Sequence, residues 1–357
     1  MEIIQALLNS KKVKYVVMEK LVKELPFETE ELNIFISADS IFKSFYSPKL
    51  NDSVKVLNDS SHYMISSEFI NIMAHYRHFF YSRYNIPTNF YIYYSSQKAT
   101  YNISKNATFK ESLYDKKSFS NLEFISLNKM IKENMELAVL LSEYLPNIFI
   151  IDTKDLDPSV VPYYIIERNG EIEGLTNLVL TTNKMEYQLA NLPNTFIMEL
   201  RSDDTRILNK EDIMKEFIKN SKSKSTIDLD SSFYTGILSI SGCKSVNVKG
   251  VDGMGGIKAV KRLERLVKSN LLPDDKNGSR LNITAKNIFE NEKELNTVID
   301  NYNALSIEEM YKNMTLKQKH IIEKCLVNKS DNMSLMEIND KYYQEFPLML
   351  IELMEGE

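Results

Sequence analysis

The stretch GCKSVNVKGVDGMGGIKAVKRLERLVK, residues 242–268, contains the most specific pattern in this sequence. Its first half is rich in glycine, which allows tight, partly left-handed turns and a close approach of other groups to the main chain. Its second half places basic and apolar residues at helical spacing, so the charges can line one side of a helix. The apolar residues that can face inward are Val260, Leu263, Leu266 and Val267. The stretch predicts a glycine-rich hairpin followed by an amphipathic basic helix.

The hairpin pattern GVDGMG, residues 250–255, is followed by GIKA, residues 256–259. Together they have the form of a helix-hairpin-helix module, which binds the DNA backbone. A phosphate can come close to glycine, and the N-terminus of the next helix points free N–H groups outward. Small Ala259 allows the two helices to pack closely. We expect Gly255→Val to abolish binding, through turn strain and a blocked approach.

The charge of this region supports the same interpretation. From Lys249 to Lys268 there are six basic and two acidic residues, a local charge of +4 in a chain of net charge −5. An acidic chain does not attract nucleic acid globally, so binding would depend on this local patch. The alternative is a glycine-rich turn before a charged surface helix. The candidate DNA-binding residues are Lys249, Gly250, Gly253, Gly255, Lys258, Lys261, Arg262 and Arg265.

Upstream of this stretch, from Asn33 onward, short apolar runs alternate with long helical periods. This alternation is typical of βαβ units and a mostly parallel sheet. Because the strands are apolar throughout, we expect helices on both faces of the sheet. The expected strands are residues 34–37, 90–94, 148–152, 178–182 and 196–200, with helices over residues 69–80 and 122–144. The predicted fold class is α/β, with a doubly wound, mostly parallel sheet.

The pattern divides the chain into four predicted parts. Residues 1–30 are an amphipathic helical extension, residues 31–210 are the α/β core, and residues 211–272 contain the helix-hairpin-helix module. The sequence LPDDKNGSR, which begins at Leu272, then breaks the pattern. Residues 273–357 are predicted to be a helical C-terminal extension, with an apolar cluster at residues 346–354.

Length and composition limit the class of protein. A chain of 357 residues with 43% hydrophobic and 26% charged residues can bury a sizeable core and is typical of soluble globular proteins. No window approaches the roughly 18 unbroken apolar residues of a membrane span, so no membrane partner is expected. Cys243 and Cys325 are too few for a disulfide scaffold or a thiolate zinc site. Without a signal peptide pattern, the expected location is a reducing cytoplasm, that of the host for a viral protein.

Five stretches, in order along the chain, resemble motifs of the 5′ nuclease superfamily: flap endonucleases, phage 5′-3′ exonucleases and the 5′ nuclease domain of bacterial DNA polymerase I. The most specific is GCKSVNVKGVDGMGGIKA, which resembles G-D-x-S-D-N-I-x-G-[IV]-x-G-[IV]-G-x-x-x-A. TTNKMEYQLA, residues 181–190, resembles T-x-D-x-D-x-x-Q-L. The weaker matches are FISADSIFKSFY (35–46), YIYYSSQKATY (91–101) and DLDPSVVPYYII (155–166). The resemblance implies a PIN-like nuclease core followed by the helix-hairpin-helix module.

The resemblance also shows where this chain departs from the family. The family hydrolyses phosphodiesters with two divalent ions, which a cluster of carboxylates holds. Hard ions such as Mg²⁺ need such oxygen ligands. The matching positions of this chain lack carboxylates and are Ser37, Ser95, Asn183, Met185, Cys243 and Val246. The resemblance therefore implies a degenerate metal site, at which Mg²⁺ or Mn²⁺ is not expected and two-metal hydrolysis is lost.

Three acids are candidates for a reduced metal site, namely Asp39, Asp155 and Asp157. The alignment is ambiguous here. In one register Asp155 and Asp157 match the family's Glu and first Asp, whereas in the other all three family acids are replaced. A structural interpretation also stays open, in which Asp157 caps a helix that begins at Pro158 and Asp39 caps the helix after the first strand.

The leading hypothesis is a catalytically inactive 5′ nuclease-like protein that keeps the backbone-binding hairpin. It would be a DNA-binding or scaffold component of a replication, repair or transcription assembly, such as one of a bacteriophage, with a protein partner on the terminal extensions. The resemblance also implies a K⁺ site at the hairpin, built from main-chain carbonyl groups. Two alternatives stay open: an active metal-dependent 5′-3′ exonuclease or flap endonuclease with a reduced metal site, and a pure protein-interaction subunit.

Overall fold

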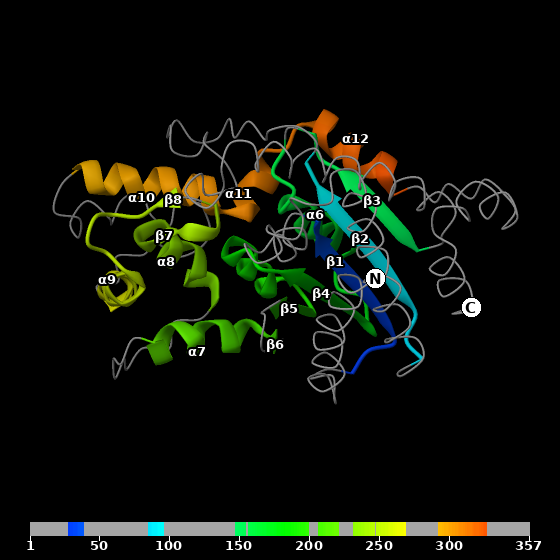
Figure 1. Cartoon of the computed structure of the whole chain (residues 1–357), viewed down its shortest axis with the longest axis horizontal. Coiled ribbons are helices and arrows are strands. Elements are labelled where there is room, and N and C mark those ends of the chain that lie inside the picture. Colours follow the sequence, from blue (N-terminus) through cyan, green and yellow to red (C-terminus); the bar gives the residue numbers. More distant parts are fainter. Residues whose placement is uncertain are drawn as a thin grey trace, which may run out of the picture.

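The computed structural model describes residues 28–38, 85–95, 147–154, 156–199, 206–220, 231–246, 248–268 and 292–326. Residues 1–27 of the predicted N-terminal extension, the helices predicted at 69–80 and 122–144, and the apolar cluster at 346–354 lie outside these ranges. The described part consists of a sheet at one end and a group of helices at the other (Figure 1).

The central sheet has six strands in the order β3-β2-β1-β4-β5-β6. The first five strands along the chain are parallel, and β6 pairs antiparallel with β5 at the edge. The chain starts in the middle of the sheet and winds outward in both directions, which confirms the doubly wound, mostly parallel prediction. The strands are β1 (Glu31–Ser37), β2 (Thr88–Tyr94), β3 (Ile148–Asp152), β4 (Leu175–Thr181), β5 (Thr195–Glu199) and β6 (Arg206–Leu208).

The five parallel strands coincide with the five predicted apolar runs, because their sequences can be buried on both faces. Every residue of β1 after Glu31 is buried, and so are all seven residues of β4. Aromatic rings stack across three strands, with 4.9 Å between the centroids of Phe35 and Tyr91 and 5.0 Å between those of Tyr91 and Phe149. Two elements flank β4: α6 (Val160–Asn169) precedes it and the 3₁₀ helix η2 (Lys184–Asn191) follows it.

Beyond the sheet, the chain forms a helix, a short β-hairpin, the glycine-rich loop at residues 250–255 and a second helix. The hairpin strands β7 and β8 pair antiparallel. The two helices, α8 and α9, lie in contact, since α9 buries Ala259 and a Cβ placed at Gly236 in α8 would lie 3.5 Å from Leu263. The elements are α7 (Lys210–Asn220), η3 (Ser231–Phe233), α8 (Tyr234–Ser241), β7 (Gly242–Cys243), η4 (Lys244–Val246), β8 (Val248–Lys249) and α9 (Gly256–Lys268).

Three C-terminal helices run from the hairpin region back to the sheet, along the top of Figure 1 in orange. They are α10 (Glu292–Leu305), α11 (Ile307–Lys312) and α12 (Leu316–Cys325). Tyr311 of α11 packs on Tyr163 of α6, with 4.9 Å between ring centroids. Glu323 of α12 pairs with Arg168 at 2.6 Å. None of the helices in the described ranges combines the length and hydrophobicity needed to cross a bilayer.

A buried amide joins these C-terminal helices to the rest of the molecule. Gln188 Nε2 donates to the carbonyls of Met185 and Leu305, both at 2.8 Å. Its Oε1 accepts from the hydroxyl of Thr235 at 3.2 Å and from the main-chain N–H of Ile307 at 3.0 Å. Residues 292–326 therefore pack against the predicted core and the predicted module alike, and the predicted domain boundaries stay predictions.

Candidate functional site

The ends of the parallel strands lie at one edge of the sheet, as predicted. Ser37 at the end of β1 is in register with Tyr93 of β2, and Tyr94 is in register with Asp152 at the end of β3. On the other side of β1, β4 ends at Thr181. The loops that follow these strands therefore place their side chains together, where an open α/β sheet usually binds its ligand.

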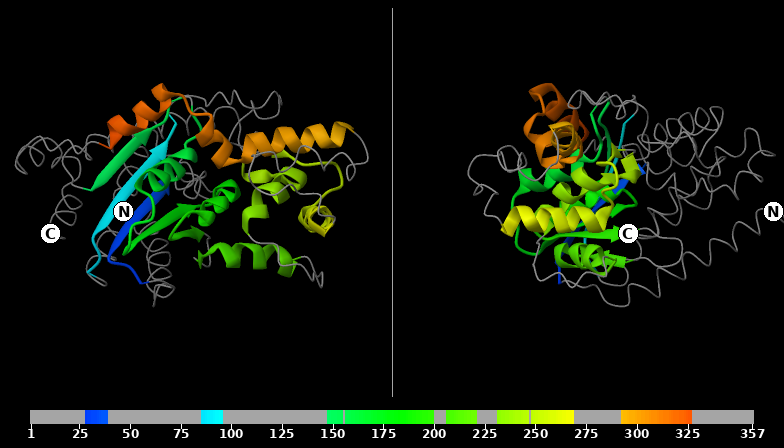
Figure 2. Two further views of the ribbon diagram at one scale, coloured as in Figure 1. Left: turned by 180° about the vertical axis from the view of Figure 1, so that it is seen from behind. Right: turned by 90° about the vertical axis from the view of Figure 1, so that its left-hand side faces the viewer.

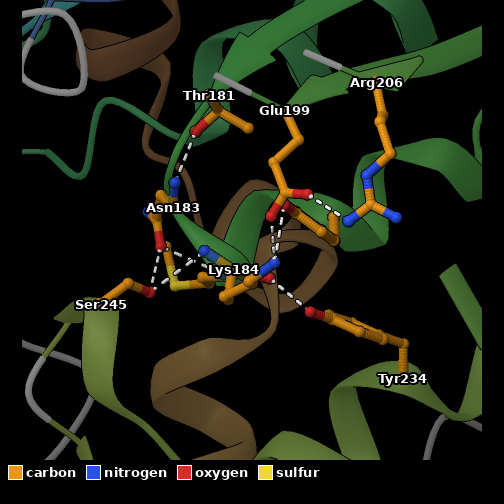
Figure 3. Close-up of polar contacts among 9 residues, drawn as sticks. Thr181, Asn183, Lys184, Glu199, Arg206, Tyr234 and Ser245 are labelled. Carbon is orange, nitrogen blue, oxygen red and sulfur yellow. Dashed lines mark hydrogen bonds and ion pairs between the residues drawn. The ribbon is translucent and has the colours of Figure 1, made fainter. Parts of the chain in front are cut away.

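Asn183 joins the two best motif matches at this edge. Its Oδ1 accepts from the hydroxyl of Ser245 at 2.7 Å and from the main-chain N–H of Met185 at 3.0 Å (Figure 3). The Ser245 oxygen in turn accepts from the main-chain N–H of Lys184 at 3.1 Å and lies 3.1 Å from Cys243 Sγ. Asn183, the main chain of Met185 and Cys243 are thus linked, with Ser245, by neutral hydrogen bonds.

Burial makes these positions unsuitable for a divalent ion. Met185 is completely buried, Val246 is 5% exposed and Cys243 is 2% exposed. Burial is also the main cause that raises the pKa of the Cys243 thiol, which keeps it protonated and a poor ligand. Within the described residues, no group of three or more His, Cys, Asp or Glu side chains is arranged to hold a metal. The described side chains at Met185, Cys243 and Val246 therefore offer no carboxylate to a divalent ion.

A positive charge lies beside the Asn183 network. Lys184 Nζ is 2.5 Å from Glu199 and 4.1 Å from the ring centroid of Tyr187. Glu199 is nearly buried at the end of β5 and also pairs with Arg206 at 3.4 Å (Figure 3). The hydroxyl of Tyr234 donates to the main-chain carbonyl of Lys184 at 2.9 Å. The one acid in this group therefore lies between two cations, which does not favour a further divalent cation.

The remaining candidate positions are distributed along the same edge. Ser37 is nearly buried, and Ser95 donates its hydroxyl to the main-chain carbonyl of Lys154. Asp39 and Asp155 lie outside the described residues. The reduced metal site can therefore be described only at Asp157, which is buried.

The predicted start of the helix at Pro158 is wrong by two residues. Helix α6 begins at Val160, with Ser159 as its N-cap residue. Asp157 Oδ1 accepts from the main-chain N–H of Ser159 at 2.8 Å, and its carbonyl accepts from Val160 at 3.2 Å. Asp157 therefore closes a turn before the helix, because a short aspartate side chain readily bonds to the backbone two residues ahead.

Glu186 is a second buried acid, besides Glu199, that the sequence pattern did not predict. Its side chain is 1% exposed and accepts from the hydroxyls of Ser159 at 2.9 Å and Tyr93 at 3.2 Å. Burial raises its pKa to about 7, against the hydrogen bonds from Thr181, Ser159 and Tyr93, and the charge of Asp157 raises it further. The only sequence signal for Glu186 was its position directly after Met185, within the stretch TTNKMEYQLA that resembles a family motif.

The hairpin and α9 form the second candidate region, with exposed charges. Lys258 and Lys261 are exposed on α9, and Arg262 is half-buried with its Nη1 3.7 Å from Met254 Sδ. Lys249 pairs with Asp252 at 3.0 Å, and both side chains are exposed. The predicted inward-facing residues Val260 and Leu263 are buried, whereas the side chains of Arg265, Leu266 and Val267 are outside the description.

The hairpin glycines have different roles. Gly253 has a φ of 73°, so it takes the left-handed turn that the pattern predicts. A Cβ at Gly250 would clash with the backbone of Ser241 and Gly242, so the close approach there is to the protein's own chain. Gly255 has no positive φ, and a Cβ there would meet nothing within 4 Å. The expected turn strain in Gly255→Val is therefore wrong.

Comparison with known proteins finds no matching family model and no matching curated protein. Several solved structures are similar. A bacteriophage T5 flap endonuclease in complex with DNA and metal ions is 11% identical, with 91% of this chain and 99% of that chain covered and a TM-score of 0.46. A zinc-bound T5 5′-exonuclease is 13% identical, with 92% and 100% covered and a TM-score of 0.42. The catalytic core of Rad2 with a DNA substrate is 12% identical, with 92% of each chain covered and a TM-score of 0.41.

Proposed function

We propose that this chain is a 5′ nuclease-like protein that binds the DNA backbone without cleaving it, as a DNA-binding or scaffold component of a replication, repair or transcription assembly, such as one of a bacteriophage. The observation that carries the proposal is the neutral network of Asn183, Ser245 and Cys243, since the resemblance implies carboxylates at Asn183 and Cys243. Two-metal hydrolysis needs several carboxylates at once, and a buried thiol and an amide cannot replace them.

The hairpin and α9 supply what backbone binding needs. Lys258 and Lys261 point into solvent, and the first N–H groups of α9 have no partner within the helix. Such groups contact phosphates rather than base edges, so we expect binding without sequence preference. The K⁺ site is part of this proposal, since main-chain carbonyl groups would hold it and no carboxylate is needed.

The first test is cleavage. Purified protein should show no Mg²⁺-stimulated or Mn²⁺-stimulated cleavage of flap or nicked-duplex DNA. Cleavage that disappears in an Asp155→Ala/Asp157→Ala double variant would establish the alternative, an active nuclease with a reduced metal site. The buried pair of Asp157 and Glu186 at the strand ends is the observation that favours this alternative.

The second test is a salt titration of fluorescently labelled nicked duplex. Each neutralised phosphate contributes about −0.9 to the slope of log K against log salt. A variant with Lys258, Lys261 and Arg262 replaced by alanine should therefore flatten the slope by about 2 to 3. If wild-type protein fails to bind at about 50 mM salt, or if both slopes coincide, backbone binding by the hairpin is refuted and the protein-interaction alternative takes its place.

A further inference from the structure

Helix α10 is held against the hairpin by a buried amide. Asn301 is 1% exposed, and its Nδ2 donates to the carbonyl of Ser239 in α8 and to the carbonyl of Lys249 in β8, both at 2.9 Å. One face of α10 is buried through Leu295 and Val298. Because Lys249 directly precedes the glycine turn, Asn301 fixes the strand from which that turn begins.

The first turn of α10 reaches the same glycine turn. Figures 1 and 2 show the loop from β8 to α9, in yellow, running alongside α10. The Asp252 carboxylate in this loop is bonded to Lys249, and its pKa is lowered first by that hydrogen bond, then by the charge of Lys249 and also by the charge of Lys293. Lys293 is exposed in the first turn of α10. The charges of two exposed lysines from different elements therefore act on one exposed acid.

We propose that the DNA-binding unit includes α10, which supplies Lys293 as a phosphate contact and holds the hairpin through Asn301. The inference rests on the proposed function and assigns a residue that lies outside the helix-hairpin-helix pattern. The occupant is the sugar-phosphate backbone of duplex DNA, because Lys293 and Lys249 are flexible point charges suited to phosphate. Asp252 is held by Lys249 only through an exposed ion pair, which a phosphate can displace at little cost.

The first experiment compares two lysine variants on labelled nicked duplex. Lys293→Ala should reduce the salt slope by about 0.9 and weaken binding about tenfold at about 50 mM salt. Lys317→Ala is the matched control, because Lys317 is an exposed lysine on α12, at the other end of the same C-terminal helices. Its slope should equal that of wild type. Both variants remove one exposed charge, so the net charge of the chain changes equally.

The second experiment separates positioning from direct contact. Asn301→Ala removes no charge, so the salt slope should stay at the wild-type value while the affinity falls about tenfold at every salt concentration. Asn296→Ala, on the exposed side of the same helix, should change neither quantity. A merely structural role for Asn301 would lower thermal stability and leave the affinity of the folded protein unchanged.

The outcomes distinguish this inference from the function on which it rests. Absence of wild-type binding overturns both. If wild type binds and the triple α9 variant flattens the slope, but Lys293→Ala behaves like Lys317→Ala, then only the contribution of α10 is refuted. Because Lys293 is exposed, its replacement leaves the fold intact and the test is decided by the slope.

Discussion

The sheet edge and the hairpin both match family motifs, yet they differ in how they use polar residues. At the sheet edge, Asn183 and Cys243 are linked to Ser245 by hydrogen bonds, and Glu186 is enclosed by hydroxyl groups. On the hairpin and α9, Lys258 and Lys261 remain in water. The residues named at the edge are buried or half-buried in the protein, whereas the hairpin and α9 present a charged surface.

The difference shows that neutral polar residues in the protein interior need partners, whereas exposed cations do not. Buried polar groups cost free energy unless they are paired, so each side chain at the edge needs a hydrogen-bond partner within the chain. Ser245 meets this need by bonding to Asn183 and to the main chain of Lys184. Exposed cations need no such partners, because water solvates them. The following predictions test this contrast, beginning with the largest effect.

Two glycines of the hairpin should differ most in their tolerance of a side chain. Gly250→Ala should lower the free energy of unfolding by about 4 kcal/mol or more, because the Cβ would meet the backbone of Ser241 and Gly242. Gly255→Ala, with open space around it, should raise it by about 0.4 to 1 kcal/mol through the unfolded state. Urea denaturation measures both. Equal changes in the unfolding free energy of the two variants would show that Gly250 does not lie against the backbone of Ser241 and Gly242.

Acids introduced at the sheet edge should differ in their cost in stability between two positions. Cys243→Asp should cost roughly 3 kcal/mol, because it places a carboxylate in a site that is 2% exposed, whereas Cys243→Ser keeps the contact with Ser245 and serves as control. Asn183→Asp should cost less than about 1 kcal/mol, because its Oδ1 already accepts two hydrogen bonds. Mn²⁺ titration should show no binding in either variant, and tight binding would contradict the described network.

Glu186 should make the stability of the fold depend on pH. Because its pKa rises from 4.5 unfolded to about 7 folded, the folded state binds the proton more tightly. Stability is therefore greatest below pH 4.5, falls as the pH rises through about 7, and is constant above that, with a total loss of roughly 3 kcal/mol. In Glu186→Gln this fall should be absent. The measurement is the difference in unfolding free energy between wild type and Glu186→Gln from about pH 4 to about pH 8. This difference should follow the titration of a single group.

The smallest effect on stability is expected on the outer side of α9. Replacing Lys258 or Lys261 with alanine should change the unfolding free energy by less than about 0.5 kcal/mol, because both side chains are exposed. The same variants should weaken DNA binding. A loss of stability above about 1.5 kcal/mol would mean that these lysines belong to the interior of the protein.

The sequence predicts the parallel strands well, since each contains a short apolar run, such as Leu178–Leu180 in β4. The edge strand β6 has only three residues, too few for a periodic pattern to indicate it. Glu186 was missed because an acid is rarely buried, so composition and spacing place it in water.

Packing of the C-terminal helices also escaped prediction, although their helical character did not. The contacts depend on Gln188 and Asn301, which are polar and read as surface residues until their partners are known. The close approach at Gly250 was equally unpredictable from the sequence. A Cβ there would clash with Ser241 and Gly242, which the fold of the chain brings close. Helices and strands that follow from a local sequence pattern were predictable. Contacts between residues far apart in the chain were not.

The amide of Gln188 has a consequence for how the chain folds as it is synthesised. Its partners at Leu305 and Ile307 lie 117 and 119 residues further along the chain. The ribosome releases the chain from its N-terminus, so the bonds of Gln188 to Leu305 and Ile307 can form only after α10 and α11 have emerged. Contacts over such separations slow folding. The sheet edge therefore closes late, after the hairpin has been made, and the last helices complete it.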